Sequence, residues 1–178
     1  EWHGRDALFV ILLATMMLPA HVTIIPIFIL FCHLGWVNTF KPLVVPAFLG
    51  GGAFFVFLLR QFFRTIPKDL FEAARLDGCS AFGMYWRIVL PLSQPALATV
   101  TIFTLNGTWN DFFGPLIYLN REEMKTLALG LQSFSGQTGS EWSQLMAISL
   151  LMIVPVLAAF FVGQRYFVEG ITLTGMKG

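Results

Sequence analysis

The chain has 178 residues, of which 56% are hydrophobic and 12% are charged, and its formal net charge is +1. Soluble domains carry about 25% charged residues, so this composition excludes an ordinary soluble domain and indicates a membrane protein. The near-neutral charge, without any basic run, gives no reason to expect a nucleic-acid partner.

Four apolar stretches are candidates for membrane spans, because a helix needs about 20 apolar residues to cross the hydrocarbon core. Each stretch contains at least one proline, and the second also contains three consecutive glycines, so we expect kinked or irregular helices. We place the spans, in chain order, at about residues 7–31, 43–59, 88–118 and 142–164.

The Lys and Arg residues of the loops indicate the orientation of the spans. With four spans, eight of these cations fall on one side and three on the other, so we expect the first side, with both chain ends, to be cytoplasmic. Trp36 and Trp142 would then lie near the outer interface. Cys32 and Cys79 would lie on opposite faces, so we expect no disulfide. The eight cations are Arg5, Arg60, Arg64, Lys68, Arg75, Arg87, Arg165 and Lys177, and the three are Lys41, Arg121 and Lys125.

A charged segment separates the second span from the third. Pro67 suits the first position of a helix, and the carboxylates of Asp69 and Glu72 suit the positive end of a helix dipole. Gly78 is placed to end this helix in a left-handed conformation. Ser80 can cap a second short helix that runs toward the third span. The residues alone leave open whether this bent pair of helices is a docking element or a plain connector.

Nothing in the sequence indicates catalysis. There is no Gly-Lys dipeptide, so a nucleotide-binding P-loop is excluded. The three histidines are scattered, and no Cys/His cluster has the spacing of metal ligands. We therefore expect neither an enzyme nor a metal site.

The charged segment has the pattern E-A-A-x3-G-x9-I-x-L-P, which resembles the signature of permease subunits of binding-protein-dependent ABC importers. In that family the segment, here residues 65–90, is a coupling helix that sits in a cleft on an ATPase subunit. The fold implied is an all-α membrane protein with a helical bundle like the transmembrane domain of type I ABC importers. The resemblance assigns coupling to Glu72, Ala73, Ala74, Asp77, Gly78, Ile88 and Pro91.

The resemblance covers nearly all of residues 1–178 and points to the carbohydrate-uptake branch, whose members import maltose-like sugars and glycerol-3-phosphate-like molecules. Members usually have six spans, so we expect this chain to be a partial transmembrane domain that lacks the two N-terminal spans. The chain also begins with Glu1 and shows no signal-peptide pattern. Further matching motifs are Leu59-Arg60-Gln61-Phe62-Phe63, Trp109-Asn110-Asp111-Phe112 and Gln164-Arg165-Tyr166-Phe167.

The resemblance also implies partners. These are a dimer of cytoplasmic ABC ATPase subunits, which hold ATP and Mg²⁺, a second permease subunit, an extracytoplasmic solute-binding protein and the lipid bilayer. The location implied is the cytoplasmic membrane of a bacterium or archaeon. The tail, with Gly175 and Lys177, resembles tails that touch the ATPase pair.

The end of the third span is the candidate solute path. Asn106 and Asn110 are four residues apart and share a helical face, and polar residues in a span usually face a cavity or the bundle interior. The ring of Trp109 suits stacking on a sugar, and Asp111 follows directly. The alternative is that these side chains only bond neighbouring helices.

The sequence alone leaves three other functions open. One is an ABC permease for a solute that is not a sugar. Another is an ion- or proton-coupled carrier, which generally needs an ionisable residue near mid-membrane, and Asp111 is the single candidate for it. The third is a structural scaffold. Neither the carrier nor the scaffold explains the Glu-Ala-Ala segment.

Overall fold

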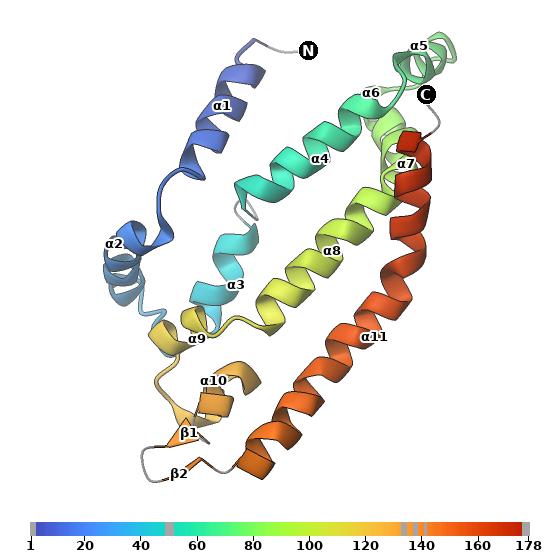
Figure 1. Ribbon diagram of the computed structural model, residues 1–178. Coiled ribbons are helices and arrows are strands. Elements are labelled where there is room, and N and C mark those ends of the chain that lie inside the picture. Colours follow the sequence, from blue (N-terminus) through green and yellow to red (C-terminus); the bar gives the residue numbers. More distant parts are fainter. Residues whose placement is uncertain (1–2, 49–51, 133–134, 137–138, 141, 176–178) are drawn as a thin grey trace. The chain divides into compact units, whose positions relative to one another are not determined.

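The computed structural model describes residues 3–48, 52–132, 135–136, 139–140 and 142–175, and helices dominate it (Figure 1). The chain forms two compact units. The first comprises Glu1–Phe54 with Gly107–Val156, and the second comprises Phe55–Asn106 with Leu157–Gly178. Three helices run from one unit into the other: α4 (Ala53–Thr65), α8 (Gln94–Trp109) and α11 (Trp142–Gly175).

The remaining elements belong to one unit each. The first unit contains α1 (Arg5–Thr15), α2 (Ala20–His33), α3 (Lys41–Phe48), α9 (Phe113–Tyr118), η2 (Glu122–Met124), α10 (Leu127–Leu131), β1 (Ser135–Gly136) and β2 (Gly139–Ser140). The second contains α5 (Lys68–Leu76), α6 (Ala81–Met84), η1 (Tyr85–Val89) and α7 (Leu90–Leu92). The two strands pair antiparallel in a short hairpin.

The best-packed part of the first unit joins the end of α2 to the end of α9. Phe31 contacts Trp36 and Tyr118, with ring centroids 5.5 Å and 5.3 Å away. Asn38, in the left-handed region at φ 60°, donates its N–H to the Tyr118 carbonyl at 2.9 Å. Its side-chain oxygen accepts from the N–H of Asn120 at 2.7 Å. These contacts hold two loops together that lie about 80 residues apart in the chain.

The second unit packs through small residues. Ser93 and Ala96 are buried, and Ser93 Oγ donates to the carbonyl of Val89 at 2.5 Å. A Cβ placed on Gly163 would lie 2.2 Å from Cδ1 of Ile102. A larger residue at position 163 would therefore force the Ile102 side chain to move at this contact between α11 and α8.

The apolar helices differ from four straight spans. Residues 7–31 are divided between α1 and α2, because Pro19 takes an extended backbone (ψ 129°) and precedes α2. Residues 88–118 are also divided: a bend of 68° separates Ala81–Leu92 from Gln94–Trp109, and α9 follows as a separate helix. Proline explains the first break, since it cannot donate to the preceding turn.

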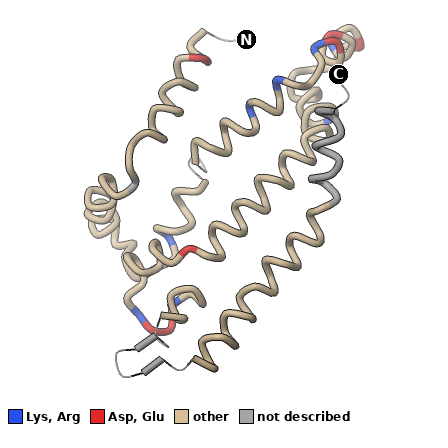
Figure 2. The backbone as a smooth tube through the Cα atoms, viewed as in Figure 1, with Lys and Arg blue, Asp and Glu red and all other residues tan. Residues whose placement is uncertain are grey.

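Two segments are long and apolar enough to cross a membrane by length and composition, among the residues that the structure describes. They are Trp142–Gln164 and Lys41–Thr65, and the second includes the undescribed residues 49–51. The bent pair, taken as one span, would be a third. Figure 2 marks the positions of Lys, Arg, Asp and Glu along the backbone: several lie on and near α5, and none lies in Trp142–Gln164 of α11.

Candidate functional site

The first half of the charged segment folds as α5. Pro67 has an extended backbone (ψ 136°) and stands immediately before the helix, which begins at Lys68. The sequence predicted that Pro67 would itself be the first helical residue, whereas the helix begins one residue after it. Asp69 lies in the first turn and Arg75 in the last, so both charges complement the helix dipole.

The turn after α5 confirms the left-handed glycine. Gly78 has φ 74° and donates its N–H to the carbonyl of Arg75 at 3.0 Å, while Cys79 donates to the carbonyl of Ala74 at 2.9 Å. This pair of bonds is the Schellman arrangement, in which a glycine just past the helix satisfies the last carbonyls. The sharp end of α5 is therefore encoded locally, between Ala74 and Cys79.

The cap of the second short helix is also confirmed. Ser80 Oγ accepts from the N–H of Gly83 at 3.1 Å, and α6 begins at Ala81. The chain then passes through a π-turn, in which Leu90 donates its N–H to the carbonyl of Tyr85, five residues earlier. No pattern in the sequence predicted this wider turn. Ile88 is half-buried within it.

The two alanines of the Glu-Ala-Ala motif lie in different surroundings. Ala74 is buried within the second unit, whereas Glu72, Ala73 and Asp77 are exposed. Leu76, at the end of α5, is 90% exposed. The helix therefore packs on its own unit through Ala74, and it offers a carboxylate, a small residue and a large apolar side chain to a partner.

Trp109 has a defined partner on another helix. Its indole Nε1–H donates to the carbonyl of Met152 at 3.0 Å. Met152 lies in α11, three residues before Pro155. The contact is the interhelical hydrogen bond that the sequence left open as the alternative to sugar binding. Trp109 as a whole is half-buried.

Asp111 is held by the start of α9. Its Oδ1 accepts from the N–H of Gly114 at 3.1 Å, which satisfies one of the donors left unpaired at a helix start. A Cβ on Gly114 would lie 2.6 Å from Asp111 Oδ2 and 2.9 Å from Leu43 Cδ2. The carboxylate thus has a structural task that its place in the sequence did not reveal.

The other candidate positions lie near the ends of α8 and α11. Asn106 lies in α8, Asn110 follows its last residue, and both side chains are exposed. Gly175 is the last residue of α11, and Lys177 lies outside the described residues.

Cys32 and Cys79 are free thiols. Among the residues that the structure describes, no group of three or more His, Cys, Asp or Glu is placed to hold a metal ion.

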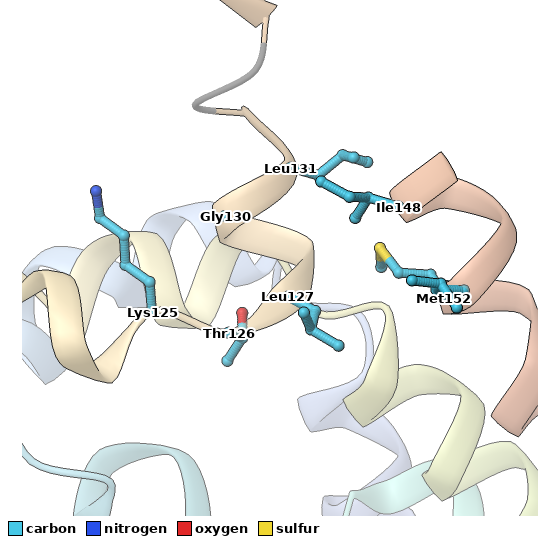
Figure 3. A pocket seen from close by; sticks show the side chains of 8 residues that line it. Lys125, Thr126, Leu127, Gly130, Leu131, Ile148 and Met152 are labelled. Carbon is cyan, nitrogen blue, oxygen red and sulfur yellow. The ribbon is translucent and has the colours of Figure 1, made fainter. Parts of the chain in front are cut away.

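The structure adds a pocket that the sequence did not indicate, of about 280 Å³, between α10 and the start of α11. Figure 3 shows apolar side chains of both helices turned toward one another, whereas the Lys125 amino group points away. That amino group bonds to Glu122 Oε1 at 2.5 Å. The lining residues are Lys125, Thr126, Leu127, Gly130, Leu131, Ile148, Leu151 and Met152.

The fold and the turn at Gly78 define a helical membrane protein with a capped polar element between apolar helices. Residues 2–172 match the family described as binding-protein-dependent transport system inner membrane component. The chain belongs to that family, whose members are membrane transport components rather than enzymes.

Several relatives have names that state a substrate. The chain is 37% identical over 178 residues to the arabinooligosaccharides transport system permease protein AraQ of Halalkalibacterium halodurans, covering all of this chain and 63% of the relative. It is 35% identical over 169 residues to the sn-glycerol-3-phosphate transport system permease protein UgpE of Yersinia enterocolitica, covering 94% of this chain and 59% of the relative. The chain thus spans about three-fifths of these curated relatives.

A solved structure supports the fold. A chain from the crystal structure of a bacterial ABC transporter involved in the import of the acidic polysaccharide alginate superposes with a TM-score of 0.76 at 28% sequence identity. The match covers 94% of this chain and 63% of the other. The expected all-α fold of an ABC importer permease is thereby confirmed.

Proposed function

We propose that this chain is part of an inner-membrane permease subunit that forms half of the path for a sugar or sugar-like solute and is driven by a cytoplasmic ATPase. The observation that carries the proposal is the capped turn at Gly78, where α5 ends in a polar, exposed element between apolar helices. Membership of the binding-protein-dependent family supports it.

The geometry of α5 suits force transmission. Its N-terminal end follows α4 through two residues, and its C-terminal end is fixed by the two carbonyl bonds of Gly78 and Cys79. The helix is thus short, ends sharply, and packs on its own unit through Ala74. Movement of an ATPase subunit that binds α5 through Glu72 and Ala73 would therefore be transmitted to the neighbouring apolar helices.

The solute class rests on the relatives. The names of two of them state arabinooligosaccharides and sn-glycerol-3-phosphate, and the solved structure concerns a polysaccharide importer. All three solutes carry many oxygen atoms, which amide side chains can bind. In this proposal Asn106 and Asn110 contact the solute. Trp109 offers a ring face while its N–H holds α11, and Asp111 shapes the start of α9.

The partners and orientation belong to the same proposal. The subunit would work with a pair of ATPase subunits, a second permease and an extracytoplasmic binding protein, with α5 on the cytoplasmic side. The tail residues Gly175 and Lys177 would lie near the ATPase pair. Five cations and three carboxylates between residues 60 and 87 agree with a cytoplasmic location, since cytoplasmic loops carry an excess of Lys and Arg.

The test is energy dependence of uptake. The full-length protein, reconstituted with its partners in vesicles, is supplied either with ATP or with a proton gradient alone, and uptake of labelled arabinooligosaccharide or glycerol 3-phosphate is measured. The proposal predicts uptake with ATP and the loaded binding protein, and none with the gradient alone. Uptake driven by the gradient without ATP would show an ion-coupled carrier instead.

A further inference from the structure

The turn at Gly78, which we call the coupling turn, is followed by a helical arm that runs across the direction of the next helix. Ala81–Leu92, which we call the arm, is bent by 68° from Gln94–Trp109. Membrane-spanning helices are tilted from the bilayer normal by about 20° on average. If Gln94–Trp109 crosses the membrane, the arm therefore lies closer to the membrane plane than to its normal.

Three aromatic side chains project from one side of this arm. Phe82, Tyr85 and Trp86, the aromatic trio, are 72%, 46% and 53% exposed. Trp86 is central, because its ring meets Phe82 at 6.2 Å and Tyr85 at 5.9 Å, both edge to face. The spacing of i, i+3 and i+4 places all three on one helical face.

The opposite side of the arm is packed against its own unit. Met84 is buried, and a Cβ on Gly83 would lie 2.8 Å from Cys79 Sγ. The π-turn that starts at Tyr85 widens the helix, and Ile88 and Leu90 beyond it are half-buried. The aromatic trio is therefore the outward face of an arm whose other face is occupied.

The chemistry around the aromatic trio matches a membrane surface with negative charge. Arg87 is exposed beside Trp86, and residues 60–87 carry five cations against three carboxylates. Trp and Tyr combine an apolar ring with a polar tip, which suits the boundary between lipid headgroups and acyl chains. Anionic lipids attract basic segments at that boundary.

We propose that the arm lies on the cytoplasmic surface of the bilayer, with the aromatic trio inserted at the headgroup level and Arg87 beside anionic lipid phosphates. The arm then anchors the coupling turn at a fixed depth, so that force applied to α5 moves the spans instead of tilting the turn. This lipid contact goes beyond the proposed coupling role, and only its cytoplasmic side rests on the proposed orientation.

The test measures the depth of two spin labels in the assembled transporter. Phe82→Cys places a label on the aromatic trio, and Leu76→Cys, at the exposed end of α5, is the matched control. Both are made in a Cys32→Ser, Cys79→Ser background of the full-length protein. Collisions of the label with oxygen, which partitions into lipid, and with a water-soluble nickel chelate are recorded with and without the ATPase.

The label at position 82 should collide more often with oxygen than with nickel, whether or not the ATPase is bound. The label at position 76 should be open to nickel and become shielded when the ATPase binds. Two results overturn the proposal: a label at position 82 that nickel reaches in the assembly, or one that is shielded only by the ATPase. The second result would make the aromatic trio an ATPase contact.

A second measurement tests whether the positive charge of Arg87 interacts with anionic lipid. In vesicles that contain phosphatidylglycerol, the ratio of oxygen to nickel collisions at position 82 should exceed that in phosphatidylcholine alone, and Arg87→Gln should reduce the difference. An equal ratio in both lipids would contradict the role given to Arg87. Labelling of the cysteine at position 82 by a membrane-impermeant thiol reagent determines separately on which side of the membrane the arm lies. A wrong orientation can therefore be distinguished from an absent lipid contact.

Discussion

The indole N–H of Trp109 bonds to the carbonyl of Met152, 43 residues along the chain. The bond joins the last residue of α8 to the turn of α11 that contains Pro155. A neutral hydrogen bond of this kind contributes about 1 kcal/mol to stability. The residue that the sequence nominated for sugar stacking is thus also a tie between two helices.

Replacing Trp109 separates these two roles. Trp109→Phe removes the N–H and keeps a ring, so it should lower the free energy of unfolding by about 1 kcal/mol and leave most uptake intact. Trp109→Ala should lower both stability and uptake. Thermal unfolding of the assembled complex and uptake at limiting solute give the two readouts. If Trp109→Phe abolishes uptake without loss of stability, the N–H serves the solute instead.

Asn110→Ala should lower uptake at limiting solute more than it lowers assembly, because the side chain is exposed at the end of α8 and is proposed to bond the solute. Subunit stoichiometry after purification reports assembly, and initial rates of uptake report transport. Asn106→Ala is the companion variant on the same face. Normal uptake in both variants would assign these amides to packing.

Asp111→Ala should destabilise the start of α9 by about 1 kcal/mol, the usual cost of losing a side-chain acceptor at a helix start. Asp111→Asn keeps an acceptor for the Gly114 N–H and should retain most of that stability. Thermal unfolding of the two variants compares them. Equal losses in both would show that the charge of Asp111, rather than the hydrogen bond, is what matters.

Labelling of the two cysteines tests the orientation of the chain in the membrane. Cys32 is exposed and Cys79 is half-buried, and the distribution of cations predicts that they face opposite sides. With single-cysteine variants of the full-length protein in intact cells, a membrane-impermeant thiol reagent should label Cys32 and should reach Cys79 only after the membrane is opened. Labelling of Cys79 from outside would reverse the assignment.

Local chemistry made the turn at Gly78 predictable. The left-handed Gly78 and the Ser80 cap depend on bonds within five residues, so the sequence around them specifies the geometry. Trp109 and Asn38 bond to atoms far along the chain, and no local pattern reveals such partners. Proline at position 19 signalled a kink, whereas the structure has a complete break there between α1 and α2, and Pro26 lies inside α2 without such a break. The π-turn at Tyr85 has no residue signature of its own.

The central claim, that the turn at Gly78 couples the permease to an ATPase, is tested most directly by charge at this position. Gly78→Asn is the matched control, because asparagine tolerates the left-handed conformation and a Cβ meets no atom within 4 Å. Gly78→Asp adds a carboxylate beside Asp77 at the negative end of α5. Buried unpaired in a tight interface, such a charge costs several kcal/mol.

The measurement is ATP hydrolysis stimulated by the loaded binding protein, together with the number of ATPase subunits that co-purify with the full-length permease. Gly78→Asn should retain most of both. Gly78→Asp should insert into the membrane normally, since the apolar spans are unchanged, and should lose the ATPase subunits or the stimulation. If Gly78→Asp keeps both the stoichiometry and the stimulated hydrolysis, α5 and its turn are a connector and the coupling account is wrong.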